Sequence, residues 1–357
     1  MTKTLKVAIV GAGIGASHIA AYQSLGDRFS VEALCDIDTA RAEKVAGRLA
    51  VPRIVESFER LLTSGLDLDI IDICTPSSLH FAQAVAAVRA GFHVVVEKPF
   101  ASSLAEADAL AELEAQSDRR VCPIFQYRFS DGITQLLHLK ERGLVAKCYS
   151  TTVETHWRRL PDYYDNPWRG RWATELGGCL TTHAIHAHDI LTYVLGPIAS
   201  VFAKTRTLVN QIETEDCAAI VLEMADGSLA TLSVTLGSEE EISRFRFYFD
   251  GLTVESNHSP YNPGTAPWRF ICADPERQKV IDAAVAEAPT GPEQNAGQFI
   301  RLHHALTEGG PLPVTIADAR RSLELLTAAY YSSRTGQEVR LPLSRDHELY
   351  GGWLAPR

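Results

Sequence analysis

The sequence predicts an α/β protein with two domains: an N-terminal parallel sheet with helices on both faces, and a C-terminal α/β domain with a large open, mostly antiparallel sheet. Two observations predict this class. Up to residue 125, short apolar runs alternate with helical patterns, as in a parallel sheet. Beyond it, long strand-like runs follow one another, several with alternating apolar and polar residues. We therefore expect domains at 1–125 and 126–357.

Each apolar run of the first domain is short enough for a strand and is followed by a helical pattern. Strands are expected at 5–10, 31–36, 69–74, 93–97 and 121–125, and helices at about 14–25, 38–49, 57–64, 78–89 and 103–117. The second domain should hold helices near 131–142, 295–308 and 315–335, and strands near 145–157, 198–208, 216–224, 228–237 and 243–255. The segment 257–268, rich in Pro, Asn and Gly, is expected to be a loop.

The composition excludes several classes of protein. The 357 residues are 46% hydrophobic, as in globular chains, and their net charge of −10 with no basic stripe excludes a nucleic-acid partner. No apolar run is long enough to span a membrane, and the first strand begins too early to leave room for a signal peptide. The seven cysteines show no C-x-x-C spacing, so we expect reduced thiols in a cytoplasmic protein.

A glycine-rich turn between the first strand and the first helix indicates a dinucleotide site. Gly11, Gly13, Ile14 and Gly15 lie in this turn, and the small Ala16 follows them. In this fingerprint Gly11 permits the tight turn, Gly13 lets the backbone approach a pyrophosphate, and Ala16 allows close helix–strand packing. The helix N-terminus offers free N–H groups to the phosphates.

The residue at the end of the second strand bears on the choice of cofactor. Asp36 stands where a carboxylate is expected to bind the ribose 2′-OH, and it would repel a 2′-phosphate. NAD is therefore favoured over NADP. Arg41, about one turn into the next helix, weakens this preference.

A lysine at the end of a buried strand is the first catalytic candidate. Lys98 follows the apolar run 93–97 and precedes Pro99, which has no N–H and restricts the residue before it to extended geometry. Lys98 should therefore stand at the carboxyl edge of the sheet, where ligands bind in open α/β folds. In isolation such a lysine is more often a solvated charge, but the dinucleotide turn favours a functional role.

These motifs, with two more, resemble those of the Gfo/Idh/MocA oxidoreductase family, which includes glucose–fructose oxidoreductase and inositol dehydrogenases. The resemblance covers nearly the whole chain and is carried by the turn at 11–16, Cys74-Thr75-Pro76-Ser77-Ser78-Leu79-His80, Glu97-Lys98-Pro99, and Gly177-Gly178 followed by His186-Ala187-His188-Asp189. It implies a Rossmann domain, a C-terminal sheet used in homodimer or homotetramer contacts, and hydride transfer between NAD(P) and a carbohydrate or cyclitol carbon.

The resemblance also implies roles for individual residues. Lys98 would hydrogen-bond the reacting oxygen, Glu97 would position the cofactor and the lysine, and His186 would act as acid and base. Asp189 matches a position that is more often structural. The remaining residues with implied roles are Thr75, Pro76 and His80 at the dinucleotide, Gln126 beside the nicotinamide, and Arg128 on the substrate side.

The chain departs from the family pattern at one point. Many members have an aspartate that assists the histidine, where this sequence has Thr182, so the relay drawn for inositol dehydrogenases is incomplete here. Residues 180–194 are helix-compatible, which places Thr182, His186 and Asp189 on one face at i, i+4 and i+7. His183 lies close to that face and is a further candidate for catalysis and substrate binding. A Lys/His pair can exchange a hydroxyl proton near neutral pH.

An aromatic and basic segment at 156–172 is expected on the substrate side, because aromatic rings stack on sugars and arginines donate to hydroxyls or carboxylates. Its candidate substrate-binding residues are His156, Trp157, Tyr164, Trp168 and Arg169. Alternatively, this segment packs a long loop or a subunit contact. A metal held by His183, His186, His188 and Asp189 is disfavoured, because His188 points away from His186 on a helix.

The leading hypothesis is an NAD-dependent dehydrogenase of a sugar, sugar derivative or polyol, with Lys98 and His186 as the acid/base relay. Two alternatives remain: a non-catalytic NAD-sensing regulator, and a glycoside hydrolase of the same fold that uses NAD transiently.

Overall fold

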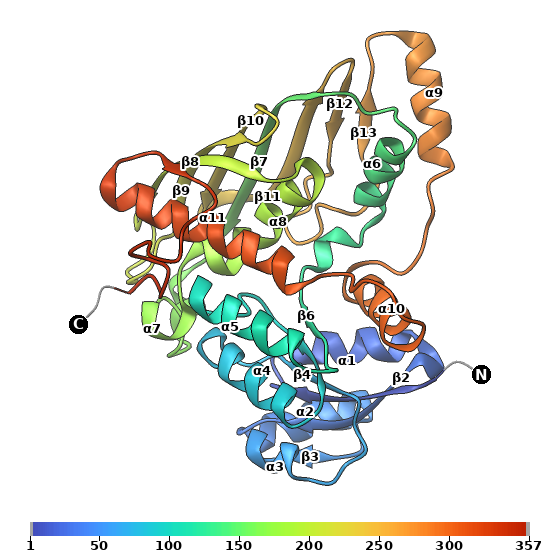
Figure 1. The fold of residues 1–357 in the computed structure, drawn as a ribbon, viewed down its shortest axis with the longest axis vertical. Coiled ribbons are helices and arrows are strands. Elements are labelled where there is room, and N and C mark those ends of the chain that lie inside the picture. The colour runs from blue at the N-terminus through green and yellow to red at the C-terminus, as the bar shows by residue number, and fades with distance from the viewer. Residues whose placement is uncertain (1–2, 355–357) are drawn as a thin grey trace. The chain divides into compact units, whose positions relative to one another are not determined.

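The computed structural model describes residues 3–354 and forms two compact units (Figure 1). The first unit contains residues 3–125 and Asn295–Arg320, and the second contains Gln126–Gln294 and 321–354. The predicted division after residue 125 coincides with one crossing of the chain between units. The segment 295–320, predicted in the second domain, belongs by its contacts to the first. Among the residues described, no helix is long and apolar enough to cross a membrane.

The first unit is built on a parallel sheet of the Rossmann type, which confirms the predicted fold class. In spatial order its strands are β3 (Ile54–Val55), β2 (Phe29–Cys35), β1 (Leu5–Val10), β4 (Ile70–Ile73), β5 (His93–Val96) and β6 (Val121–Pro123). The strand order reverses between β1 and β4. In such sheets, ligands bind outside the carboxyl ends of the strands at this point.

Helices cover this sheet, and their ends follow from local sequence. They are α1 (Gly15–Ser24), α2 (Thr39–Leu49), α3 (Phe58–Leu62), α4 (His80–Arg89), α5 (Leu104–Ala115) and α10 (Gln294–Thr307). Asp38, Ser57 and Ser103 cap α2, α3 and α5, because each side chain accepts a backbone N–H of the first turn.

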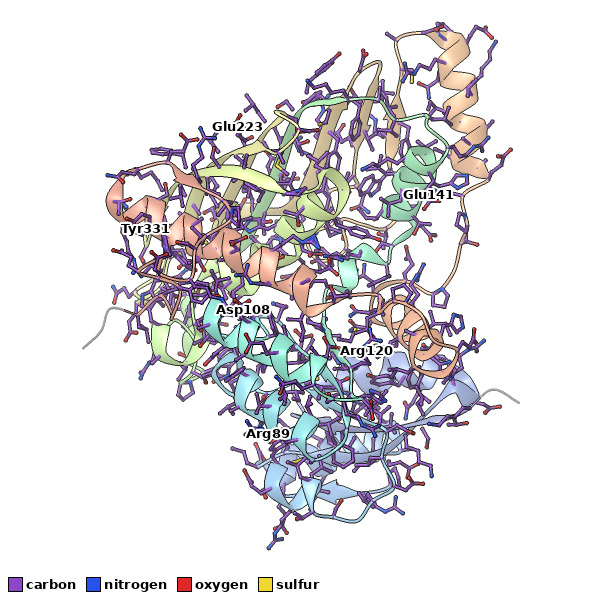
Figure 2. All side chains as sticks on the ribbon, viewed as in Figure 1. Arg89, Asp108, Arg120, Glu141, Glu223 and Tyr331 are labelled. Carbon is purple, nitrogen blue, oxygen red and sulfur yellow. The ribbon has the colours of Figure 1, made fainter. Side chains whose placement is uncertain are left out.

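Two contacts explain why 295–320 belongs to the first unit. Phe299 of α10 stacks on Tyr22 of α1, with ring centroids 4.0 Å apart and planes 4° apart. Arg320, in α11 (Ile316–Thr335), donates from Nε to Oδ1 of Asp108 on α5 at 2.6 Å; Asp108 is labelled in Figure 2. An apolar stack and an ion pair therefore join this segment to helices of the N-terminal sequence.

The second unit is built on an eight-stranded sheet. Its spatial order is β13 (Arg269–Ile271), β12 (Leu252–Glu255), β11 (Gly237–Phe249), β7 (Cys148–Arg158), β10 (Leu229–Thr235), β9 (Cys217–Met224), β8 (Ile198–Arg206) and β14 (Val339–Arg340). Only the β10–β7 pair is parallel among the strands described, so the predicted mostly antiparallel sheet is confirmed.

The prediction of one strand over 243–255 was wrong. The chain turns at Asp250-Gly251, where Gly251 has φ +69°, and returns as β12 paired with β11.

The helices of this second unit are α6 (Asp131–Glu141), α7 (Trp172–Glu175), α8 (Ile185–Leu195), α9 (Pro275–Ala286) and most of α11. Helix α9 was not predicted, although Asp274 caps it and Pro275 occupies its first turn.

Candidate active site

The first glycine of the turn is required by its surroundings. Gly11 has φ +104°, and a Cβ there would lie 2.5 Å from the carbonyl oxygen of Cys74. Its N–H donates to the carbonyl of Cys35 at 2.7 Å, so the turn is tied to the ends of two neighbouring strands. Only glycine combines this backbone conformation with this close approach.

The rest of the turn leaves space for a ligand. A Cβ on Gly13 would meet nothing within 4 Å, and the side chain of Ile14 is 50% exposed. Close helix–strand packing lies at Gly15, whose Cβ would be 2.7 Å from Cγ2 of Ile9, rather than at the half-buried Ala16 as predicted. An open turn leading into the N-terminus of α1 fits the pyrophosphate of a dinucleotide.

Asp36 is a buried carboxylate at the end of β2. It accepts the N–H of Ala12 at 2.7 Å and that of Asp38 at 2.8 Å. Nη2 of Arg41 donates to both of its oxygens, at 2.9 and 3.1 Å. Burial opposes ionisation of Asp36, but the hydrogen bonds from Arg41 and the two amides hold its pKa below the usual value. Arg41 is therefore directed at Asp36, and the pair fits the ribose end of NAD.

The Thr75–His80 segment is joined to the loop that follows Lys98. His80 is buried, with Nδ1 2.7 Å from the carbonyl oxygen of Pro99 and Nε2 2.7 Å from that of Thr75. Burial lowers the pKa of His80, and a neutral imidazole can donate to only one of these carbonyls. His80, the first residue of α4, thus joins the segment that contains Pro76 to the loop that follows Lys98.

Lys98 lies at the carboxyl edge of the sheet, as predicted, separated from the end of β5 by Glu97, and it is half-buried. Glu97 beside it is 7% exposed, and its Oε2 accepts the backbone N–H of Lys98 at 3.1 Å. Oε1 of the same carboxyl lies 3.1 Å from Nε2 of His18.

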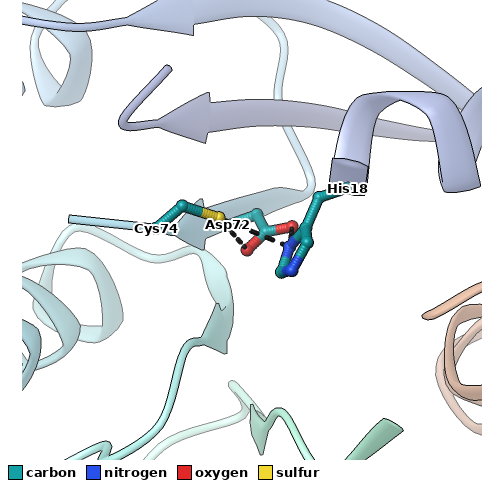
Figure 3. A group of neighbouring side chains, drawn as sticks. All are labelled: His18, Asp72 and Cys74. Carbon is teal, nitrogen blue, oxygen red and sulfur yellow. Dashed lines mark hydrogen bonds and ion pairs between the residues drawn. The ribbon is translucent and has the colours of Figure 1, made fainter. Parts of the chain in front are cut away.

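One group of metal-type ligands occurs among residues 3–354, and it is not the one weighed from the sequence. His18, Asp72 and Cys74 are buried and offer atoms within 4.8 Å of one another (Figure 3). His188 is also buried, and burial lowers its pKa to about 3. It is therefore a neutral core histidine.

In the second unit, Gly178 approaches another backbone segment closely. A Cβ on Gly178 would lie 1.8 Å from the carbonyl oxygen of Glu215. The carboxyl of Glu215 accepts the N–H groups of Gly178 and Leu180 and the hydroxyl of Tyr330, at 2.9 to 3.1 Å. Burial raises the pKa of Glu215 to about 7. Sequence reasoning missed Glu215, because no spacing links it to Gly178.

The helix that carries the histidines begins with a π-helical turn at Leu180–Ala184, and α8 starts only at Ile185. His186 and Asp189 keep their α-helical spacing in α8, but Thr182 lies in the π-helical turn, so the regular i, i+4, i+7 face predicted for the three residues does not extend to Thr182. Oγ1 of Thr182 donates to the carbonyl of Gly178 at 2.8 Å and lies 2.7 Å from Nδ1 of His183. Thr182 thus contacts His183.

His183 is held by hydrogen bonds on both ring nitrogens. Nε of Arg159 donates to Nε2 of His183 at 3.1 Å. The hydroxyl proton of Thr182 is donated to the carbonyl of Gly178, so its oxygen accepts a hydrogen bond from Nδ1–H of His183. Nε2 accepts from Arg159, which assigns the neutral Nδ1–H tautomer to His183.

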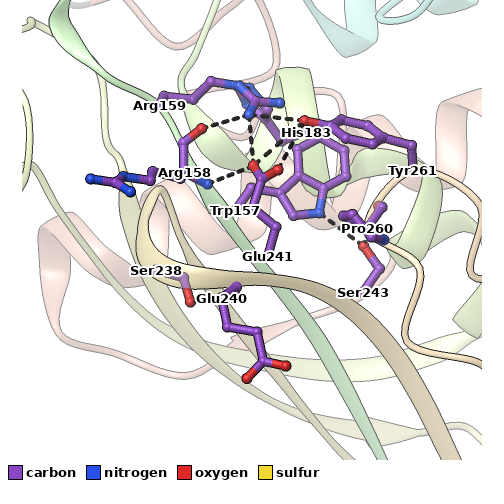
Figure 4. A network of polar contacts seen from close by, with 10 residues as sticks. All are labelled: Trp157, Arg158, Arg159, His183, Ser238, Glu240, Glu241, Ser243, Pro260 and Tyr261. Atoms are coloured by element: carbon purple, nitrogen blue, oxygen red, sulfur yellow. Dashed lines mark hydrogen bonds and ion pairs between the residues drawn. The ribbon is translucent and has the colours of Figure 1, made fainter.

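Arg159 is the centre of a polar network that links β7, β11 and the loop after β12 (Figure 4). Its Nη1 donates to Oε1 of Glu241 at 3.1 Å and to the hydroxyl of Tyr261 at 3.2 Å. Its guanidinium also lies over the ring of Trp157, 5.1 Å from the centroid. Trp157 is buried and packs edge-on against His183, with centroids 5.3 Å apart. The sequence pointed to this segment but not to Arg159 as its centre.

His186 lies in α8, is 6% exposed, and has its ring centroid 4.9 Å from that of Tyr127. Arg128, predicted on the substrate side, is instead buried and donates through Nε and Nη2 to Asp189, each at 2.6 Å. This bidentate pair anchors α8 to the short 3₁₀ turn at Gln126–Arg128. Gln126 lies at the start of the same turn.

The aromatic segment does not present all its predicted residues together. Strand β7 extends to Arg158, so His156 and Trp157 point to opposite faces of the sheet. His156 contacts Ser233 of β10 at 3.0 Å, while Trp157 faces His183. Arg169 pairs with Glu175 at 3.1 Å and stacks on Trp168. Tyr164 lies in the 3₁₀ turn Pro161–Tyr164 and contacts the ring of Tyr163.

Comparisons with known proteins match both halves of the chain. Residues 5–125 match the model GFO_IDH_MocA, "Oxidoreductase family, NAD-binding Rossmann fold", and residues 133–255 match the "GFO/IDH/MocA C-terminal domain". The D-apiose dehydrogenase of Rhizobium rhizogenes is 24% identical over 349 residues, which cover 94% of this chain and 97% of that protein.

Two further similarities are informative. A glycosyl hydrolase family 109 protein of Streptomyces filamentosus is 32% identical over 192 residues, which cover 50% of this chain and 38% of that protein. The crystal structure of the WlbA dehydrogenase from Bordetella pertussis, in complex with NADH and UDP-GlcNAcA, superposes with a TM-score of 0.82 at 26% identity. That match covers 96% of this chain and all of that one.

Proposed function

The chain belongs to the Gfo/Idh/MocA family of NAD-binding oxidoreductases, and we propose that it is a dehydrogenase acting on a secondary alcohol of a sugar, sugar derivative or cyclitol. The observation that carries this proposal is the half-buried Lys98 at the carboxyl end of β5, one strand away from the switch between β1 and β4. The homologous dehydrogenases of sugars support the carbohydrate class.

The residues that would hold NAD are those of the open turn and its neighbours. Gly11, Gly13 and Gly15 offer backbone to the pyrophosphate, and Asp36 offers its carboxylate to the ribose. Bound nicotinamide supplies a hydride acceptor or donor. The fingerprint residues Ile14, Thr75, Pro76, His80 and Gln126 are proposed to line the same cofactor.

The residues of this chain would handle the proton. We assign Lys98 as a donor that hydrogen-bonds the reacting oxygen, and His186 as the group that takes or returns its proton. His183 is held neutral between Thr182 and Arg159 and would bind a substrate hydroxyl. Thr182 acts through His183, so it is a positioning residue.

On the substrate side, Trp157 and Arg159 combine an aromatic ring with a cation, as ligand sites for sugars do. Arg128 is not among the proposed substrate-binding residues, because it is buried in its pair with Asp189. His156 is excluded as well, because it lies on the face of β7 opposite Trp157. Tyr164, Trp168 and Arg169 remain candidates.

The test is an absorbance assay of NAD reduction with a panel of sugars, sugar acids and cyclitols, run in parallel with NADP. We expect turnover with NAD, and a loss of about 10²- to 10⁴-fold in kcat for Lys98→Ala. Lys44→Ala is the matched control, because Lys44 is exposed on α2 of the same unit. Normal turnover by the Lys98 variant would refute the assigned chemistry.

A second candidate function is supported by the glycosyl hydrolase relative. A hydrolase that uses NAD transiently would release the aglycone from a nitrophenyl glycoside without net formation of NADH, which separates it from the dehydrogenase. Cofactor binding without turnover on either panel would instead indicate a regulator that senses NAD.

We also propose that the chain forms a homodimer or homotetramer through the open face of its eight-stranded sheet. Phe202 and Val221 are neighbours on β8 and β9, and they are 40% and 51% exposed. Sedimentation equilibrium would test this, with Val221→Lys expected to shift the population toward monomer.

A further inference from the structure

A buried histidine of the first unit lies between two carboxyl groups, and Figure 3 shows it beside one of them, that of Asp72. His18 projects from α1, and its Nδ1 lies 2.8 Å from Oδ2 of Asp72 on β4. Its Nε2 lies 3.1 Å from Oε1 of Glu97, which follows β5. His18 and Asp72 are fully buried, and Glu97 is 7% exposed. Three separate elements therefore bring their charged groups together inside the unit.

The contacts in this cluster are those of hydrogen bonds rather than of a metal centre. Sγ of Cys74 lies 3.3 Å from Nδ1 of His18 and 3.4 Å from Oδ1 of Asp72. A metal would need a thiolate and a bare Nδ1. Burial instead raises the pKa of the Cys74 thiol, and Nδ1 is directed at a carboxyl oxygen.

Both ring nitrogens of His18 face carboxyl oxygens, so both are donors and the ring is an imidazolium. Burial is the largest influence on the pKa of His18 and lowers it, but the attraction and hydrogen bond of Asp72, together with those of Cys74, outweigh burial and raise this pKa well above its usual value. The other groups around the ring are Cys74 after β4, Tyr22 of α1, and Phe299 of α10, whose ring lies edge-on at 5.4 Å. None of these supplies a competing cation.

Glu97 transmits this arrangement to the proposed catalytic lysine. One oxygen of its carboxyl contacts His18, and the other accepts the backbone N–H of Lys98 at 3.1 Å. A continuous set of hydrogen bonds therefore runs from Asp72 through His18 and Glu97 to the main chain of Lys98.

We infer that His18 is a positioning residue: an imidazolium clamp between Asp72 and Glu97 that fixes the turn on which Lys98 is carried. The inference rests on the proposed role of Lys98 for its effect on turnover, but the clamp itself is a property of the first unit alone. If His18 is replaced by an uncharged residue, the two buried carboxyls lose their shared cation, and one of them keeps a proton to a higher pH. The turn that carries Glu97 and Lys98 is then no longer fixed by the imidazolium.

The first test is the charge of His18 in the intact protein. We would label the histidines with ¹⁵N and follow the ring nitrogens by NMR, assigning His18 with His18→Gln. The expected result is an imidazolium that still holds both N–H protons at pH 8, where an ordinary histidine is neutral. In Asp72→Asn the ring should deprotonate at lower pH. A neutral ring at pH 8 in the unmodified protein, or stoichiometric zinc by elemental analysis, would overturn the inference.

The second test is turnover. His18→Gln should lower kcat by about 10- to 100-fold, as displacement of a catalytic group does, and should move the acid limb of the kcat profile to higher pH. Asp72→Asn added to it should cost little more, because the two residues act as one unit. His303→Gln is the matched control, since His303 is also fully buried in the first unit but binds the carbonyl of Lys3.

A uniform loss at every pH in His18→Gln, with an unmoved acid limb, would show a structural residue and overturn the inference. If the unmodified enzyme turns over no sugar while His18 is an imidazolium at pH 8, the proposed function fails and the clamp stands. The two failures are thus distinguishable.

Discussion

Replacing Gly178 by Ala tests the close backbone approach that begins the histidine helix. The added Cβ would lie 1.8 Å from the carbonyl oxygen of Glu215, 2.7 Å from its carbonyl carbon and 2.8 Å from its nitrogen. These are backbone atoms, so no side chain can rotate away. Ordinary contact begins near 3.4 Å, and the two segments must therefore separate by about 1.6 Å.

That separation breaks the hydrogen bonds that join the segments. The N–H of Cys179 donates to the carbonyl of Glu215 at 2.8 Å, and that of Gly178 donates to the Glu215 carboxyl at 3.0 Å. Both groups are buried, and each unsatisfied pair costs about 1–3 kcal/mol. We expect Gly178→Ala to lower the free energy of unfolding by about 3–6 kcal/mol, including overpacking.

The assay is thermal and urea unfolding followed by circular dichroism, together with turnover of the best substrate. Gly291→Ala is the matched control in the same unit, because its Cβ would meet nothing within 4 Å and its backbone is not left-handed. The control should change stability by less than about 0.5 kcal/mol. A Gly178→Ala protein as stable as Gly291→Ala would refute the close approach and the role assigned to Glu215.

Three other outcomes are expected. Burial raises the pKa of Glu215 to about 7, so between pH 4.5 and 7 the folded state holds a proton that the unfolded carboxyl has lost. Relative to Glu215→Gln, the parent protein should therefore lose about 3 kcal/mol of stability between pH 4.5 and 8. Urea titration at each pH measures this loss. Asp189→Asn leaves buried Arg128 without its charge partner and should cost about 3–5 kcal/mol in the same assay, whereas an unchanged midpoint would contradict the buried pair. Asp36→Ala releases Arg41 and should raise the ratio of kcat/KM for NADP to that for NAD by about tenfold or more, which an unaltered ratio would disprove.

Local sequence determined much of the first unit. The glycine turn, Asp36 at the end of β2 and Lys98 at the end of β5 lie where they were predicted, because each follows an apolar strand and is set by chain geometry near it. Pro99 stops the ladder after β5, and Gly11 permits a left-handed backbone; neither effect needs distant contacts. The antiparallel character of the second sheet likewise follows from alternation along single strands.

The tertiary structure alone decided how the side chains at the site are partnered. Thr182 contacts His183 within a π-helical turn, where the sequence predicted a regular α-helix. Arg128 binds Asp189, and Glu215 binds the turn at Gly178, across 61 and 37 residues of sequence. His18 meets Asp72 and Glu97 across 54 and 79 residues. Periodicity reports which face of an element is buried, but the partner of a buried charge depends on which elements pack together, and no local pattern encodes that pairing.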